Sequence, residues 1–133
     1  MFDLTTDELT AIGGASTIVI GESGVSTGTL TVDGTADFSG DSLTIYAGSI
    51  VDGASGVLTA GTLSADVGTG SIALDNADVH GISNLGAVTA DGGFTLDNGD
   101  TSLTVTGTLS TTGNVSIDVG AGTYAQNLSL IHI

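Results

Sequence analysis

Short triplets with an apolar residue on each side of a small central residue recur along the chain, separated by glycine, asparagine or aspartate. The clearest are Ile18-Val19-Ile20, Leu30-Thr31-Val32, Leu43-Thr44-Ile45, Ile72-Ala73-Leu74, Phe94-Thr95-Leu96, Leu103-Thr104-Val105 and Val115-Ser116-Ile117. Successive side chains of a β-strand point to opposite faces, so the two outer residues of a triplet share a face. Each triplet therefore predicts a short strand with one buried face.

Turn residues stand between the triplets. Asp33-Gly34, Asp52-Gly53 and Asn98-Gly99 are examples. Glycine and asparagine tolerate the positive φ angles of tight corners, and aspartate initiates turns by accepting hydrogen bonds from its own backbone. Many short strands with frequent turn signals predict an all-β fold.

Two all-β architectures fit this pattern. Asp33-Gly34 and Asn98-Gly99 are also hairpin turn signals, which leaves a sandwich of hairpins open. The likeness of the triplets to one another and the scarcity of large side chains favour a β-solenoid, whose narrow interior accepts Val, Ile, Leu and Ala. We therefore predict one solenoid domain over residues 17–127, with about four to six irregular coils of roughly twenty to twenty-five residues each.

The two ends of the sequence differ from this region. In residues 1–16, Thr5 or Thr6 with Asp7 and Glu8 could cap one helical turn, so we expect a lead-in turn or short helix. Residues 128–133 lack the glycine, threonine and aspartate of the rest. They match the translation of CTGTCTCTTATACACATC, a transposon-end sequencing adapter, so we expect a non-native tail on a fragment of a longer protein.

Composition narrows the function classes. The chain has no Lys, Arg, Cys or Pro, and its formal net charge is −15. Nucleic acids and anionic membranes should repel such a chain, and we expect neither as a partner. No apolar run reaches membrane-spanning length, so we expect no direct membrane insertion. High charge with few aromatic residues also fits a disordered chain, but the alternating Val, Ile and Leu favour strands.

The opening Asp3-Leu4-Thr5-Thr6-Asp7-Glu8-Leu9-Thr10-Ala11-Ile12-Gly13, followed by Thr17-Ile18-Val19-Ile20-Gly21 and the repeated triplets, resembles the repeat region of filamentous-haemagglutinin-like exoproteins. The resemblance covers residues 3–125. It implies a right-handed parallel β-helix, secretion to the bacterial cell surface, and an adhesive or stalk-like role without catalytic residues. It also implies a ligand on a host or neighbouring cell, and a parent chain that stacks on both ends. Autotransporter passengers share this texture, so a calcium-stabilised passenger or surface-layer module is the alternative.

Carboxylates supply the only candidate cofactor site. Asp33, Asp37 and Asp41 recur every four residues, and Asp97 and Asp100 flank Asn98-Gly99. Oxygen ligands of this kind suit Ca²⁺. Neither a helix-loop-helix calcium loop nor a glycine-rich nonapeptide repeat is present, so turn formation is the competing explanation. We expect no other cofactor.

Other chemistry has weaker support in the sequence. Asp78 and His80 could share a strand face as metal ligands, but with no further His or Cys nearby we expect His80 to be an exposed turn residue. Without Lys or Arg as a base, and without a Gly-x-Ser-x-Gly elbow, we expect no enzymatic activity. Threonine runs at 27–31 and 104–108 could form a binding array for ice or crystalline carbohydrate, but the irregular triplet spacing argues against that.

Overall fold

In the computed structural model, which describes residues 16–76, 79–126 and 131–132, the chain forms a parallel β-solenoid of about five turns. No helix occurs within those residues. The strands are β1 (Thr17–Ile20), β2 (Thr29–Val32), β3 (Thr35–Tyr46), β4 (Ser49–Asp52), β5 (Val57–Asp66), β6 (Ser71–Leu74), β7 (Gly81–Thr89), β8 (Gly93–Asp97), β9 (Leu103–Val105), β10 (Leu109–Thr111), β11 (Val115–Asp118), β12 (Tyr124–Gln126) and β13 (Ile131–His132).

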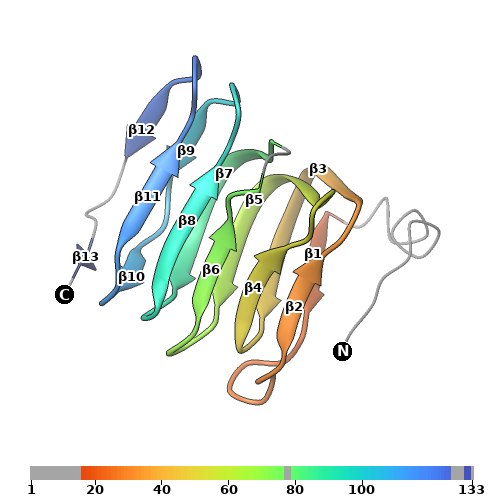
Figure 1. Ribbon diagram of the computed structural model, residues 1–133, viewed down its shortest axis with the longest axis vertical. Helices are drawn as coiled ribbons and strands as arrows, with labels where there is room; N and C mark the ends of the chain where they lie inside the picture. The colour runs from red at the N-terminus through yellow and green to blue at the C-terminus, as the bar shows by residue number, and fades with distance from the viewer. Residues whose placement is uncertain (1–15, 77–78, 127–130, 133) are drawn as a thin grey trace.

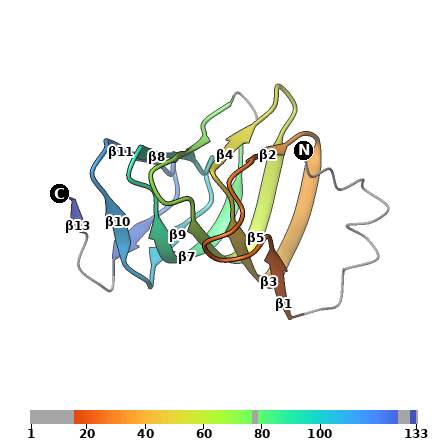
Figure 2. The same cartoon turned by 90° about the horizontal axis from the view of Figure 1, so that it is seen from below.

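The strands form two sheets that wrap one core (Figure 1). The smaller sheet has the order β11-β8-β6-β4-β2, and the larger follows β1-β3-β5-β7-β10-β13, with β9 pairing both β7 and β12. Figure 2 shows the two sheets on opposite sides of the molecule. Each pairing between described strands is parallel, which confirms the solenoid and excludes the sandwich of hairpins.

Each coil bends where its longest strand turns a corner. The register of β3 against β5 shifts between Phe38 and Ser42, next to Gly40, whose φ of 85° suits glycine. The register of β5 against β7 shifts between Leu63 and Ala65. In the next coil, β9 and β10 take the place of one long strand, because β7 pairs with both of them. Extra residues are thus absorbed at the corners while the flat parts of the sheets stay in register.

The core consists of columns of apolar side chains, one from each coil. Along the smaller sheet the column recurs at intervals of 20 to 22 residues and contains Leu30, Ile50, Ile72, Phe94 and Val115. A second column along the larger sheet contains Leu43, Leu63, Leu85 and Val105. Burial of each such side chain is worth about 1.5–3 kcal/mol relative to exposure, so these columns are the main stabilising feature of the fold.

Glycines are stacked at the corner that enters the smaller sheet. The backbone N–H of Gly92 donates to the carbonyl of Gly70 at 2.8 Å, and Gly48 lies directly below Gly70. An added Cβ at Gly70 would meet the Gly48 carbonyl oxygen, and one at Gly92 would lie 2.9 Å from the carbonyl carbon of Gly70. The column is therefore required by close backbone contact, although none of these three glycines has a positive φ.

The described residues test the predictions for the two ends of the chain only in part. Residues 1–15 lie outside them, so the expected lead-in turn or helix stays a prediction. Within 128–133, the strand β13 pairs in parallel with β10 through Ser110↔Ile131 and Thr111↔His132. Residues 127–130 and 133 lie outside the described region of the chain, and the non-native origin of this tail also stays a prediction.

Candidate functional site

His80 is buried in the corner between β6 and β7, with 1% of its surface exposed. The expectation of an exposed turn histidine is therefore wrong. The backbone N–H of Leu58, in the preceding coil, donates to Nδ1 of His80 at 2.9 Å. The backbone N–H of His80 donates to the carbonyl of Asp97 in the following coil at 3.1 Å. His80 thus links three coils, and this is the physical reason for its burial.

These contacts fix the tautomer of the imidazole. A backbone N–H can only donate, so Nδ1 of His80 is an acceptor and the ring proton sits on Nε2. Nε2 lies 2.9 Å from Oδ2 of Asp52 and donates to it. The pair is therefore a neutral imidazole hydrogen-bonded to a carboxylate, and the ring nitrogens are both occupied by protein partners.

Asp52 occupies the inward column of the smaller sheet, in register with the buried Val32. Its side chain is only 5% exposed, which is costly for a carboxylate without partners. Its Oδ2 accepts hydrogen bonds from Nε2 of His80 and from the backbone N–H of Asn76, the latter at 2.9 Å. The side-chain amide of Asn76 in turn donates to the carbonyl of Gly53. These bonds replace the solvation that Asp52 loses.

Asn98 has the same role in the following coil and is fully buried. Its Oδ1 accepts from the backbone N–H of Ile82 at 2.8 Å, and its Nδ2 donates to the carbonyl of the same residue at 2.8 Å. The Asn98 side-chain amide thus pairs with the backbone of Ile82 as the backbone of a neighbouring strand would, at a point before β9 begins. His80 and Asn98 thus continue the hydrogen bonding between neighbouring coils around the corner. We therefore assign this polar cluster a structural role.

The calcium candidates lie at separate corners or strand ends. Oδ1 of Asp37 accepts from the N–H of Ser39 at 2.9 Å, and Oδ1 of Asp97 accepts from the N–H of Gly99 at 3.0 Å. The hydrogen bonds from the backbone and hydroxyl of Ser39 lower the pKa of Asp37 below its ordinary value of 3.8. Oδ1 of Asp100 accepts from the N–H of Ala121 at 2.8 Å.

The two remaining candidates, Asp33 and Asp41, are exposed and half-buried respectively. Among the described residues, no three His, Cys, Asp or Glu side chains converge as metal ligands. Asp78, the candidate co-ligand of His80, lies outside the described residues. Asp66 and Asp118 form turns like those of Asp37 and Asp97, each accepting from an N–H two residues later. The observed bonds match the turn-forming explanation.

Asp97 and Asp118 are nevertheless directly stacked, because β8 and β11 pair them in register. Neighbouring strands of a sheet are about 4.8 Å apart, and the chain offers no Lys or Arg to separate the two charges. The pairing places two carboxylates, one of them the sequence candidate Asp97, where a shared cation could lie.

The outer face of the smaller sheet carries no charge along its two central columns. One column runs in strict register through Thr31, Val51, Ala73, Thr95 and Ser116. The other contains Thr29, Ser49, Ser71 and Gly93. We call these nine residues the neutral face. The next outward column of the same sheet contains Asp97 and Asp118, so an uncharged strip of methyl and hydroxyl groups crosses five strands beside a pair of carboxylates.

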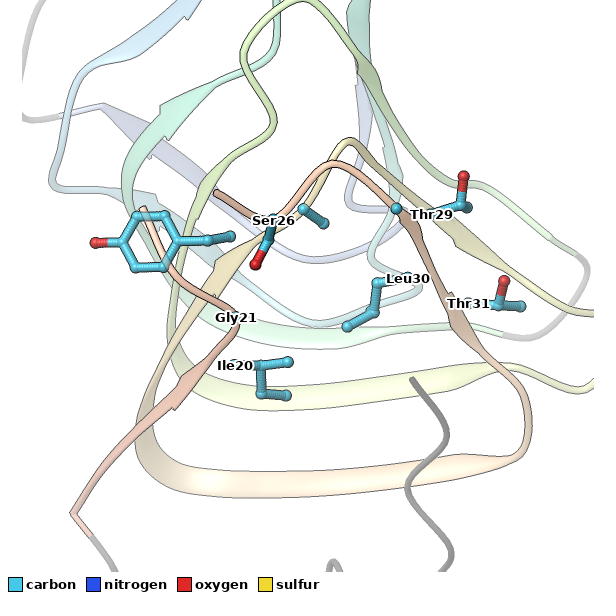
Figure 3. A pocket seen from close by; sticks show the side chains of 9 residues that line it. Ile20, Gly21, Ser26, Thr29, Leu30 and Thr31 are labelled. Carbon is cyan, nitrogen blue, oxygen red and sulfur yellow. The ribbon is translucent and has the colours of Figure 1, made fainter. Parts of the chain in front are cut away.

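The first coil contains an open hollow of about 590 Å³. Figure 3 shows that Ile20, Ser26 and Leu30 point into it, while Thr29 and Thr31 point away. Tyr46 also lines it. Ile20 and Leu30 are only partly buried, unlike the members of the same apolar columns in the middle of the stack. Within the part of the chain that the structure describes, the hollow is the open end of the core rather than an enclosed cavity.

Searches against protein-family models, curated proteins and solved structures found no match for this chain. Among the described residues, none belongs to a helix with the length and apolar character needed to cross a membrane.

Proposed function

We propose that the chain is a structural and adhesive segment of a secreted bacterial surface exoprotein, in which it serves as a stalk or a contact surface. The observation that carries the proposal is the neutral face, held in register across five strands of a chain with net charge −15. The resemblance of the sequence to filamentous-haemagglutinin-like repeats supports the same class of function.

A stalk must resist bending and local unfolding. A parallel ladder runs along each sheet, and among the described residues Asp52 is the one charged residue that interrupts the apolar columns from coil to coil. In stacked-repeat proteins each coil is stabilised by its neighbours, so the coils in the middle of the stack are supported on both sides. A rigid rod of this kind supports a role in holding a contact surface away from the cell.

The neutral face supports contact with a partner for electrostatic reasons. Cell surfaces are commonly anionic, and a strongly acidic protein is repelled from them wherever its carboxylates are exposed. A strip of Thr, Ser, Ala and Val requires no desolvation of charge when it meets another surface. We therefore place the proposed contact on the smaller sheet, with an uncharged or hydroxyl-rich ligand such as a glycan.

Attachment of protein-coated beads to cultured epithelial cells tests this placement. The variant pair Ala73→Asp and Thr95→Asp puts two carboxylates on adjacent strands of the neutral face, since these residues pair in register. The pair Thr44→Asp and Ser64→Asp adds the same two charges to adjacent strands of the larger sheet. We expect wild-type and Thr44/Ser64 beads to attach equally, and Ala73/Thr95 beads to lose attachment.

Two results would contradict the proposal. Wild-type beads that attach no better than uncoated beads would remove the adhesive role. Equal attachment by both double variants would remove the neutral face as the contact. Circular dichroism of each variant, showing the β-rich spectrum of the wild type, ensures that lost attachment reflects the surface and not unfolding.

A calcium-stabilised passenger or surface-layer module is the second candidate, and the stacked pair Asp97 and Asp118 is the observation that favours it. Calcium would relieve repulsion between these carboxylates, whose oxygens are the ligand type that it prefers. Thermal melting in calcium and in chelator, at matched ionic strength, separates the candidates. A rise of many degrees that Asp118→Asn removes supports calcium, and identical melting in both buffers supports the metal-free stalk.

A further inference from the structure

Asn98 is the one asparagine of the chain that is followed by glycine. In an Asn-Gly dipeptide the backbone nitrogen of the glycine can attack the side-chain amide carbon of the asparagine and form a five-membered succinimide ring. Glycine favours this step because it has no Cβ to hinder the approach and few limits on φ and ψ. In the absence of structure, Asn98 is therefore the asparagine of this chain most susceptible to deamidation.

The fold directs the two reacting groups away from one another. The Oδ1 of Asn98 accepts from the N–H of Ile82 at 2.8 Å, and its Nδ2 donates to the carbonyls of Ile82 and Thr101 at 2.8 and 3.0 Å. The backbone N–H of Gly99 instead donates to Oδ1 of Asp97 at 3.0 Å. The ring cannot close until these bonds break and the corner between β8 and β9 opens.

Burial adds a second barrier to the reaction. Asn98 has 0% of its surface exposed. Its backbone N–H donates to the carbonyl of Asp118 in the next coil at 2.8 Å, and its carbonyl accepts from the N–H of Thr101 at 3.1 Å. Water is needed to hydrolyse the succinimide, and it cannot reach a fully buried side chain while the corner is closed.

We propose that Asn98 is a modification site, at which deamidation proceeds only while the corner between β8 and β9 is open and then prevents that corner from closing. The Gly99 nitrogen loses its proton to water and bonds to Cγ of Asn98, and Nδ2 leaves as ammonia. Water then adds to either carbonyl carbon of the ring, one C–N bond breaks, and the nitrogen regains a proton. The net change is amide plus water to carboxylate plus ammonium, with no oxidation or reduction.

Neither product fits the closed corner. An aspartate at this position replaces the Nδ2 donor with an oxygen that faces the carbonyls of Ile82 and Thr101 in a fully buried site. A buried polar group without a partner is costly, and a buried charge is more so. Isoaspartate also lengthens the backbone by one methylene group at a residue whose N–H and carbonyl are both bonded. The modified chain therefore keeps a covalent record of having opened, whether or not it has the proposed adhesive role.

Prolonged incubation at mildly alkaline pH, with and without urea, tests the site. The chain has no Lys or Arg for trypsin, so a protease that cleaves after Phe and Leu releases the segment that contains Asn98, and mass spectrometry measures its deamidation. Asn114 is the internal control, since it is exposed and is followed by valine. In urea, Asn98 should react many times faster than Asn114. In native buffer the rate at Asn98 should fall by about 100-fold or more, as expected for a corner that is open less than about 1% of the time.

A pair of variants tests the consequence of the modification. Asn98→Asp introduces the product of deamidation into the native corner, and it should lower the midpoint of urea denaturation or prevent folding. Asn114→Asp adds the same charge to an exposed residue and should change the midpoint little. Circular dichroism identifies which samples are folded in native buffer.

Three results would overturn the proposal. The first is deamidation of Asn98 in folded protein at the rate that it has in urea, and the second is equal rates at Asn98 and Asn114 in urea. The third is a denaturation midpoint of Asn98→Asp equal to that of the wild type. The first two come from the wild type alone, so they decide the matter even where Asn98→Asp does not fold.

Discussion

Nε2 of His80 donates a hydrogen bond to Oδ2 of Asp52 over 2.9 Å, across 28 residues of sequence. The bond joins the end of β4 to the corner that precedes β7, one coil later. Both side chains are buried, and the bond between them joins the Asn76 N–H on Asp52 to the Leu58 N–H on His80 in one network. The pair is a structural link between coils, and its removal should lower the free energy of unfolding of the whole solenoid.

Replacement of this histidine tests the link. His80→Ala removes one of the two hydrogen-bond donors to the buried Asp52 carboxylate, which keeps the N–H of Asn76, and takes away the acceptor of the Leu58 N–H, so we expect a loss of about 3 kcal/mol in the free energy of unfolding. Chemical denaturation monitored by circular dichroism measures the loss. Val79→Ala, which shortens a neighbour with 55% of its surface exposed, serves as the control and should change little. An equal effect of the two variants would show that the link is unimportant.

The stacked glycines give a second prediction. Gly70→Ala should destabilise the chain by about 3 kcal/mol, because the added methyl group meets the carbonyl of Gly48 and the corner cannot relax without moving a strand. Gly28→Ala is the matched control, since an added Cβ there meets nothing within 4 Å. Denaturation midpoints compare the two. A tolerated Gly70→Ala would mean that the coils are not in the close register described.

The sequence was sufficient to predict the class of fold. Each apolar triplet that lies wholly within the described strands supplies residues to the core, as Phe94 and Leu96 do in β8. The spacing of the triplets looked irregular because consecutive ones belong to different sheets. Phe94-Thr95-Leu96 lies in β8 and Leu103-Thr104-Val105 in β9, whereas the residues that stack along one sheet recur at 20 to 22. The in-register neutral face was missed for this reason.

The burial of His80 was beyond what the sequence alone could indicate. Its neighbours Val79 and Gly81 suggested a turn, and its partners Asp52, Leu58 and Asp97 lie in other coils. Only the coil spacing, once known, places Leu58 opposite His80. The turn-forming role of Asp97 was readable, because Asp97-Asn98-Gly99 is a local signal and the bond from Gly99 is local as well.

Salt should stabilise this protein at every pH where its carboxylates are ionised. The chain has no Lys or Arg, so its charges are almost all carboxylates that repel one another. Salt therefore weakens this repulsion without weakening stabilising ion pairs. Between about 0.01 M and 1 M salt the screening length falls from about 30 Å to about 3 Å. We expect the melting temperature to rise over that range in dilute solution, measured with chloride salts of monovalent cations. A falling melting temperature would reveal attractive ion pairs that the structure does not contain among its described residues.

Acid should remove the contribution that the Asp37 carboxylate makes to the stability of the folded state. Hydrogen bonds from Ser39 lower the pKa of this carboxyl below 3.8, its ordinary value. A group whose pKa is lower in the folded state stabilises that state above its unfolded pKa, and the contribution is lost as the pH falls through the folded pKa. The stability advantage of the wild type over Asp37→Asn should therefore be constant above about pH 5 and shrink below pH 3.8.

Denaturation of both proteins along a series of pH values measures this difference. The comparison with Asp37→Asn cancels the general relief of repulsion that acid gives to the other carboxylates. An advantage that stays constant down to about pH 2, well below the ordinary range of Asp, would contradict the assignment of these hydrogen bonds.

Oxidative cross-linking tests the parallel, in-register stacking of coils most directly. The chain has no Cys, so Val51→Cys and Ala73→Cys can be introduced as the only thiols. These residues pair in register on neighbouring strands, at a spacing of about 4.8 Å that a disulfide can bridge. Val51→Cys with Ala87→Cys is the control, because Ala87 is exposed on the other sheet. The account predicts a rapid intramolecular disulfide in the first pair only, seen by mass spectrometry; no cross-link there, or an equal one in the control, would contradict it.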